Sequence, residues 1–315
     1  MLAPKLGEVQ GIIDARMASA AAPRIPEVTA HLVNAGGKRL RPMLCLAAAA
    51  MTGDARGNDA KLGATVEFIH TATLLHDDVV DGARQRRGRP TANLLWDNTS
   101  SVLVGDYLFA RAFQLMVECG SLRVLDILSD AAATIAEGEV LQLTAQRNLS
   151  VDEGTYIRIA RGKTAALFAA ACEAGALVAG ADDATAEAFR SYGDALGIAF
   201  QIADDLLDYA GDSSATGKAV GGDLSEGKMT LPVIKSVVTG EDGAFWERVV
   251  GRGDLRDGDL DTALAIFARH GALDETRREA LDWSARARDA MTPFPASPLR
   301  AALVDLADYV VARIS

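Results

Sequence analysis

Apolar residues recur about every 3.6 positions along almost the whole chain, and this pattern constrains the fold more than any other feature. In the segment 60–81, for example, Leu62, Val66, Ile69 and Val80 follow such a stripe. That spacing is the repeat of an amphipathic α-helix. No segment shows the sustained alternation of a strand, and no Asn-Gly turn indicates a hairpin. The sequence therefore predicts an all-α protein.

The same pattern predicts further helices, separated by short breaks that are rich in Gly and Pro. Alanine, the strongest helix former, is abundant, while aromatic residues make up only 5% of the chain. None of the breaks is a long linker of low complexity, so we expect one domain over residues 1–315. The additional helices are expected at about 98–119, 121–147, 163–180, 183–209, 228–239, 255–270, 272–291 and 296–313.

The charge and the cysteines limit the class of partner and the compartment. A formal net charge of −11 argues against a general nucleic-acid binder, because phosphate backbones require clustered cations. Three scattered cysteines without metal-binding spacing indicate free thiols in a reducing compartment. The most apolar long window, 165–181, contains Glu173 and is short for a spanning helix. We expect a cytosolic protein without stable membrane insertion.

A motif of the form D-D-x-x-D occurs twice, each time near the end of a predicted apolar helix. Its outer carboxylates share one helix face and repel each other by about 0.2–0.5 kcal/mol. They also lie at the negative end of the helix dipole. A hard divalent cation such as Mg²⁺ removes both conflicts. Polar helix ends that face water are the alternative interpretation. The carboxylates are Asp77, Asp78 and Asp81 in the first copy and Asp204, Asp205 and Asp208 in the second.

Basic residues accompany these acids at Gly- and Pro-rich breaks. Guanidinium groups bind phosphate oxygens in a bidentate way, and a helix start offers free N–H groups to an anion. Acids that bind a metal beside bases that bind phosphate indicate a magnesium–diphosphate ligand, although solvated charges are the alternative at each place. The basic segments are the loop 82–90 with Arg86 and Arg87, the turn 36–42 with Lys38 and Arg41, the pair Lys163 and Thr164, and the segment 211–228 with Lys218 and Lys228.

Several strings together resemble the trans-type polyprenyl diphosphate synthases, most closely their long-chain octaprenyl and decaprenyl branch. The resemblance is strong over residues 34–235. The carriers are GGKRLRP, FIHTATLLHDDVVD, GDYLFARAF, EGEVLQL and GIAFQIADDLLDY. The resemblance implies a single-domain helical bundle of the isoprenoid synthase type around a central cavity, in a homodimer. The two aspartate motifs would face each other across the cavity mouth.

The resemblance also implies roles for individual residues, with all six aspartates serving catalysis. Mg²⁺ would be held by Asp77, Asp81 and Asp204, with Asp78 and Asp208 assisting. The allylic diphosphate would be held by Arg86, Lys163, Thr164, Gln201 and Lys218. Isopentenyl diphosphate would be held by Lys38, Arg41, His70 and Arg87.

The implied reaction adds isopentenyl diphosphate to an allylic diphosphate, with farnesyl diphosphate as the expected primer. Ala72 and Thr73 precede Asp77 by four to five residues, about 6–8 Å along a helix. Because both are small, the growing tail is expected to pass them and to end deeper in the protein. The product expected is a chain of about eight to ten isoprene units for a quinone side chain. The candidate floor residues are Phe113, Met116 and Leu128.

Two alternatives remain at this level. A class I terpene cyclase also uses an aspartate motif, but its second metal site normally mixes Asn, Ser and Glu. A non-catalytic subunit of a heteromeric synthase typically loses the aspartates that this chain keeps. The sequence also departs from the family pattern at Ala219, Gly222 and Met229, where Asn, Asp and Pro are more usual, in the segment that carries Lys218 and Lys228.

Overall fold

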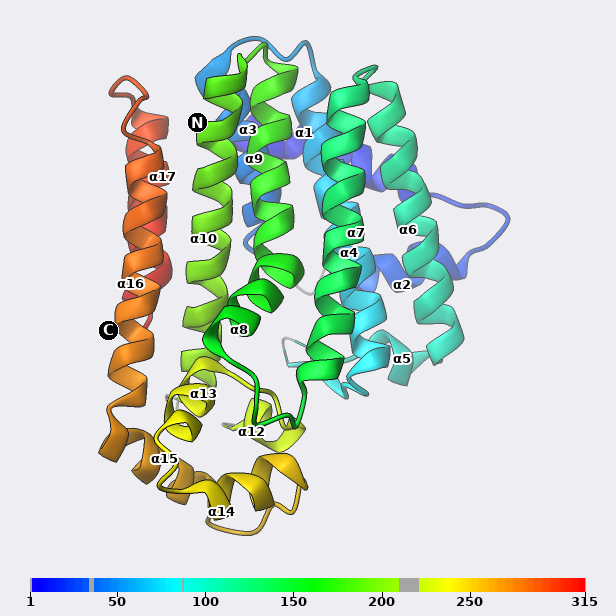
Figure 1. Ribbon diagram of the computed structural model, residues 1–315. Helices are drawn as coiled ribbons and strands as arrows, with labels where there is room; N and C mark the ends of the chain where they lie inside the picture. The colour runs from blue at the N-terminus through cyan, green and yellow to red at the C-terminus, as the bar shows by residue number, and fades with distance from the viewer. Residues whose placement is uncertain (1, 34–36, 87, 210–220, 315) are drawn as a thin grey trace. The chain divides into compact units, whose positions relative to one another are not determined.

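The computed structural model describes residues 2–33, 37–86, 88–209 and 221–314, and regular structure in these ranges is almost entirely helical (Figure 1). The all-α prediction is confirmed. Within these ranges the strands are β1 (Gln85–Arg86) and β2 (Arg89–Pro90), which pair antiparallel. This short hairpin lies in the segment 82–90, where a loop without strands was expected.

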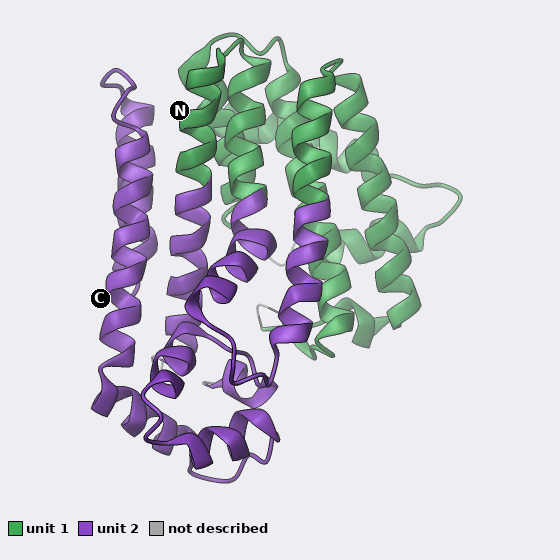
Figure 2. Ribbon diagram, viewed as in Figure 1, with its two compact units in different colours: residues 1–132, 167–193 green, residues 133–166, 194–315 purple. Residues whose placement is uncertain are grey.

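Contacts within the chain divide it into two compact units (Figure 2). The first comprises Met1–Ala132 and Leu167–Gly193, and the second comprises Ala133–Ala166 and Asp194–Ser315. Two long helices, α7 (Leu122–Ala145) and α10 (Asp183–Tyr209), begin in the first unit and end in the second, as their change of colour in Figure 2 shows. One domain over residues 1–315 stays a prediction.

The first unit is organised around α4, which packs against α6, α3 and α1. Its side chains Phe68, Ile69 and Leu75 are almost completely buried, as the apolar stripe predicted. The helix ends beside the first aspartate motif, at Val80. Besides parts of α7 and α10, this unit contains α1 (Ala3–Met17), α2 (Arg24–Val33), α3 (Leu40–Thr52), α4 (Asn58–Val80), α5 (Ala92–Leu95), α6 (Asn98–Glu118) and most of α9 (Ala166–Val178).

In the second unit α16 packs against α17 and α13, and an aromatic cluster fills the core. The rings of Trp246 and Phe267 stack with centroids 5.7 Å apart, and Tyr209 meets Phe267 edge-on at 5.1 Å. Besides parts of α7 and α10, this unit contains α8 (Glu153–Ala160), the π-helical segment η1 (Arg161–Ala165), α12 (Gly222–Glu226), α13 (Leu231–Val238), α14 (Gly243–Trp246), the π-helical segment η2 (Glu247–Gly251), α15 (Asp259–His270), α16 (Ala272–Ala290) and α17 (Pro298–Ala312).

Capping residues explain where several helices begin and end. The side chain of Asp97 accepts a hydrogen bond from the N–H of Ser100 at the start of α6, and Asp152 does the same for Thr155 at the start of α8. Each such cap is worth about 1 kcal/mol. Gly271, with φ of 66°, ends α15 and begins α16. Of the helices described, none combines the length and the apolar character needed to cross a bilayer.

Candidate active site

The first aspartate motif divides into two carboxylates that are partly or fully exposed and one that is buried. Asp77 is half-buried in the last turn of α4, and Asp81 is the exposed residue that caps this helix. The N–H of Asp81 donates to the carbonyl of Asp77 over 2.8 Å, which keeps the helical geometry through the motif. The side chain of Asp78 is fully buried. Asp77 and Asp81 are therefore the members placed to meet a ligand from solvent.

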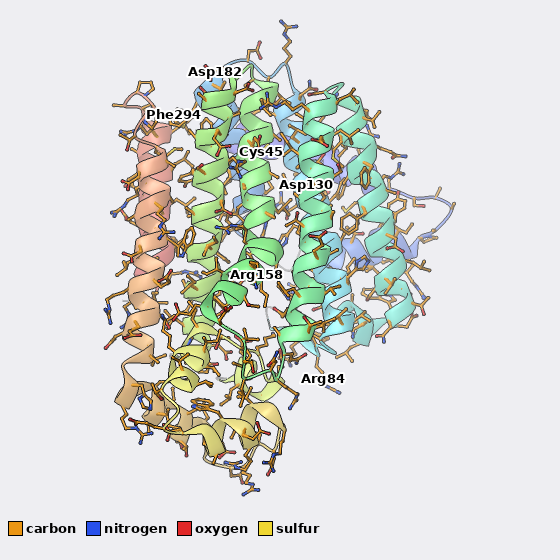
Figure 3. All side chains as sticks on the ribbon, viewed as in Figure 1. Cys45, Arg84, Asp130, Arg158, Asp182 and Phe294 are labelled. Carbon is orange, nitrogen blue, oxygen red and sulfur yellow. The ribbon has the colours of Figure 1, made fainter. Side chains whose placement is uncertain are left out.

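The buried Asp78 holds the basic loop against the end of α4. Its carboxylate accepts a hydrogen bond from Nε of Arg86 over 2.8 Å, and its carbonyl accepts one from the N–H of Ala83 over 3.0 Å. The same loop carries Arg84, which is labelled in Figure 3. A buried carboxylate requires such a partner, because an uncompensated charge inside a protein is costly. Asp78 thus fixes Arg86 at the end of α4 that carries the motif.

Two residues expected to bind isopentenyl diphosphate are brought together in the first unit. Nη1 of Arg41, on α3, lies 3.2 Å from Nε2 of His70, on α4, and the Arg41 guanidinium covers the ring of Phe168 at 4.6 Å. Because Arg can only donate, Arg41 is the donor and Nε2 of His70 the acceptor in this pair. Lys38 is exposed in the turn before α3. Arg87 lies outside the described residues.

The second motif repeats the division of the first. Asp204 is exposed and Asp208 half-buried, whereas Asp205 is 6% exposed. Asp205 accepts hydrogen bonds from the hydroxyl of Tyr156 over 2.6 Å and from Nε2 of Gln201 over 2.7 Å. Burial, together with the negative charge of Asp223, raises the pKa of Asp205 to about 7. A desolvated carboxylate favours its neutral form.

The two outward members of this motif also have partners within the second unit. A carboxylate oxygen of Asp204 lies 3.0 Å from Nη2 of Arg313, which follows α17. A carboxylate oxygen of Asp208 accepts the N–H of Asp223 over 3.0 Å. A cation at Asp204 would therefore have to compete with a guanidinium for the same oxygen.

Residues expected to hold the allylic diphosphate gather around η1. The hydroxyl of Thr164 donates to Oε1 of Gln201 over 2.7 Å, and the ammonium of Lys163 donates to Glu139 of α7 over 2.9 Å. We expected Lys163 and Thr164 to open a helix, and this was wrong. Helix α8 continues through η1 into α9, so these residues lie inside a helical stretch and their N–H groups form no helix start. Lys218 lies outside the described residues.

Glycines let helices approach closely at η1. A Cβ added to Gly197 of α10 would lie 2.5 Å from Cα of Ala165. One added to Gly162 would lie 2.9 Å from Cα of Gly138, on α7. Since Cβ atoms essentially never come this near another heavy atom, only glycine allows these contacts. The contact with α10 is the one that brings Thr164 within hydrogen-bond distance of Gln201.

The residues predicted to control chain length have distinct environments in the first unit. Ala72 is completely buried on α4, and Met116 of α6 and Leu128 of α7 are each 1% exposed. Thr73 is half-buried and donates its hydroxyl to the carbonyl of His70. Phe113, by contrast, is 41% exposed, so it does not form a buried floor within this chain. The roles of the other four stay predictions.

The carboxylates suit magnesium in type and number. Mg²⁺ takes oxygen ligands and is usually bound by one or two carboxylates together with substrate phosphates. Within the described ranges, no three His, Cys, Asp or Glu side chains converge on a complete metal site. Asp77 with Asp81, and Asp204 in the other unit, are of the kind that a diphosphate-bound Mg²⁺ would use.

Several partners of the predicted residues were missed by the sequence reasoning. Glu139 stands in the string EGEVLQL, which carried the resemblance but suggested no role. Tyr156 precedes Thr164 by eight residues, a helical spacing that could have indicated a shared face. Nothing local in the sequence connects Arg313 or Asp223 to the second motif, because these contacts depend on tertiary structure.

The chain belongs to the polyprenyl synthetase family, whose model matches residues 22–267. It is 44% identical over 293 residues to an all-trans-nonaprenyl-diphosphate synthase (geranyl-diphosphate specific) of Rhodobacter capsulatus, covering 92% of this chain and 89% of that protein. The crystal structure of a decaprenyl diphosphate synthase from Rhodobacter capsulatus is similar with a TM-score of 0.96 and 59% identity, covering 100% of this chain and 97% of that one. A polyprenyl synthase from Caulobacter crescentus CB15, complexed with calcium and isoprenyl diphosphate, is similar with a TM-score of 0.95 and 48% identity, covering 100% and 96%.

Proposed function

We propose that this chain condenses isopentenyl diphosphate head-to-tail with an allylic diphosphate to make a long-chain all-trans polyprenyl diphosphate. The observation that carries the proposal is the repeated division of the two motifs. Each leaves its first and last aspartates partly or fully exposed and buries the second against a side chain expected to bind diphosphate. The similarity to nonaprenyl and decaprenyl diphosphate synthases supports the same activity.

The chain's own residues would bind and ionise the allylic substrate. Arg86 is held by Asp78, and Gln201 by Asp205, so their donors are oriented before the diphosphate arrives. Preorganised donors stabilise the charge that develops on a leaving group without further reorganisation. Mg²⁺, held by Asp77, Asp81 and Asp204, would neutralise the charge of the departing diphosphate. No side chain needs to act as a dedicated base if the released diphosphate accepts the proton.

The second substrate, isopentenyl diphosphate, would be bound by Arg41, His70 and Lys38. Arg41 is anchored by His70 and by the ring of Phe168, which limits its conformations and leaves a fixed positive charge for a phosphate. The double bond of isopentenyl diphosphate would then attack the ionised allylic carbon. Arg87 and Lys218 belong to this proposal through the family resemblance.

The proposal extends to the product, the assembly and the compartment. Small residues at Ala72 and Thr73 favour a long product of about eight to ten isoprene units, suited to a quinone side chain. On helix α6 the apolar residues Leu103, Phe113 and Val117 have 61%, 41% and 66% of their surface exposed to solvent. A second copy of the chain would bury such apolar area, so we propose a homodimer. The cytosolic location is part of the same proposal.

A product assay tests this function and separates it from its alternatives. The purified protein is incubated with Mg²⁺, labelled isopentenyl diphosphate and farnesyl diphosphate, and the products are resolved by chain length. Condensation predicts a discrete long polyprenyl product. Turnover of farnesyl diphosphate to hydrocarbon without incorporation of label would instead indicate a terpene cyclase. Complete inactivity would indicate a subunit that requires a partner.

A further inference from the structure

Four side chains of the second unit form a continuous series of hydrogen bonds. Tyr156 donates to one carboxylate oxygen of Asp205 over 2.6 Å, and Nε2 of Gln201 donates to the other over 2.7 Å. Oε1 of Gln201 in turn accepts the hydroxyl of Thr164 over 2.7 Å. The series joins α8, α10 and η1, and α8 is the helix that carries Arg158, labelled in Figure 3.

The chemistry of the groups gives this series a direction. The Gln201 amide turns its NH₂ toward Asp205 and its carbonyl toward Thr164. The Thr164 hydroxyl therefore donates its hydrogen bond to Oε1 of Gln201. One N–H hydrogen of Gln201 is not used by these bonds and can meet a diphosphate oxygen. The orientation of Gln201 therefore depends on Asp205.

Burial makes Tyr156 important for that orientation. Tyr156 is 4% exposed, and Thr164 is 7% exposed, so water has little access to replace a missing partner. Among the described residues, Tyr156 and Gln201 are the side chains that donate to the carboxylate of Asp205. Without the Tyr156 hydroxyl, Asp205 would keep one of these bonds and could reorient. Hydrogen bonds in a buried series reinforce one another, so loss of the Tyr156 bond should change the geometry of the neighbouring bond from Gln201.

We propose that Tyr156 is a positioning residue for the allylic diphosphate, acting through Asp205 to orient the amide of Gln201. The inference rests on the proposed function, in which Gln201 and Thr164 bind that diphosphate. It assigns Tyr156 no contact with substrate. It also separates the roles within the second motif, since Asp205 orients a binding group while Asp204 faces outward.

The test replaces Tyr156 with Phe, which keeps the ring and removes only the hydroxyl. Binding of inorganic pyrophosphate with Mg²⁺ is measured by calorimetry, and KM is measured separately for farnesyl and isopentenyl diphosphate. We expect pyrophosphate affinity to fall and KM for farnesyl diphosphate to rise by roughly tenfold each, with KM for isopentenyl diphosphate unchanged. Tyr192→Phe is the matched control, since Tyr192 is also a fully buried tyrosine but belongs to the first unit.

A double variant shows whether the effect passes through Gln201. Gln201→Met removes the amide at similar volume, so Tyr156→Phe should cause no further loss of pyrophosphate affinity in that background. Additive losses, an equal rise in KM for both substrates, or the same losses in Tyr192→Phe would overturn the inference. Wild-type protein that binds pyrophosphate but makes no prenyl chain would contradict the proposed function alone, because the pyrophosphate affinities of the variants would still decide the role of Tyr156.

Discussion

Replacing Gly197 with Ala should separate α10 from η1 and disturb the binding of the allylic substrate. The new methyl carbon would lie 2.5 Å from Cα of Ala165, whereas carbon atoms in contact normally sit about 3.5–4.0 Å apart. Because the neighbour is backbone, relief requires a shift of about 1 Å between the two segments. Such a shift breaks the 2.7 Å bond from Thr164 to Gln201. Overpacking of this kind costs about 1–3 kcal/mol of stability.

The assay combines thermal unfolding, followed by circular dichroism, with steady-state kinetics. We expect Gly197→Ala to unfold at a lower temperature and to lose up to about a hundredfold in kcat/KM for farnesyl diphosphate, since a displacement of about 1 Å at a reacting site can cost that much. The control is Gly11→Ala on α1, where a Cβ meets nothing within 4 Å and the helix should gain about 0.5–1 kcal/mol. Unchanged unfolding and unchanged kinetics in Gly197→Ala would refute this reasoning.

Three further outcomes follow from named contacts. Ala72→Tyr should shorten the product by blocking the tail path along α4, as seen by chromatography; an unchanged product length would refute that path. Arg313→Ala should tighten Mg²⁺ binding at Asp204 by up to about fivefold in calorimetry, because a competing guanidinium is removed, whereas unchanged affinity would mean that it does not compete. Hydrogen bonds from Arg248 lower the pKa of Asp259 to about 2, so this pair stabilises the fold above the ordinary Asp pKa and its effect is lost as the pH falls toward 2. Arg248→Met should therefore lower the unfolding temperature most at pH 5 and progressively less in more acidic solution; a constant difference would contradict this account.

The regular helices could be predicted because their apolar residues repeat with the helical period. The expected helix at 60–81 is observed as Asn58–Val80, and that expected at 183–209 is observed as Asp183–Tyr209. Helix α1 was not assigned, and Gly7 and Gly11 interrupt its pattern. The π-helical segment η1 was read as a helix start, because Gly162 looks like a break in the sequence. In the structure the missing side chain of Gly162 instead allows η1 to pack closely against Gly138 of α7.

The candidate site was predicted as residue types but not as contacts. The spacing of D-D-x-x-D showed that the first and last carboxylates share a face, and it placed Asp78 and Asp205 to one side. It could not show that each of these two is buried and hydrogen-bonded to a side chain from elsewhere. Arg86, which bonds Asp78, lies on a hairpin, and Tyr156, which bonds Asp205, lies on another helix. Local periodicity carries no information about such tertiary pairs.

The central claim is that both aspartate motifs serve one magnesium-dependent condensation, and the most direct test compares initial rates in matched variants. Label incorporation from isopentenyl diphosphate into farnesyl diphosphate is measured for the wild type with and without EDTA, and for Asp81→Asn and Asp204→Asn with excess Mg²⁺. The account predicts no incorporation with EDTA and losses of at least about a hundredfold in each variant, with wild-type unfolding temperatures. Incorporation that persists with EDTA, or a nearly unchanged rate in either variant, would contradict it.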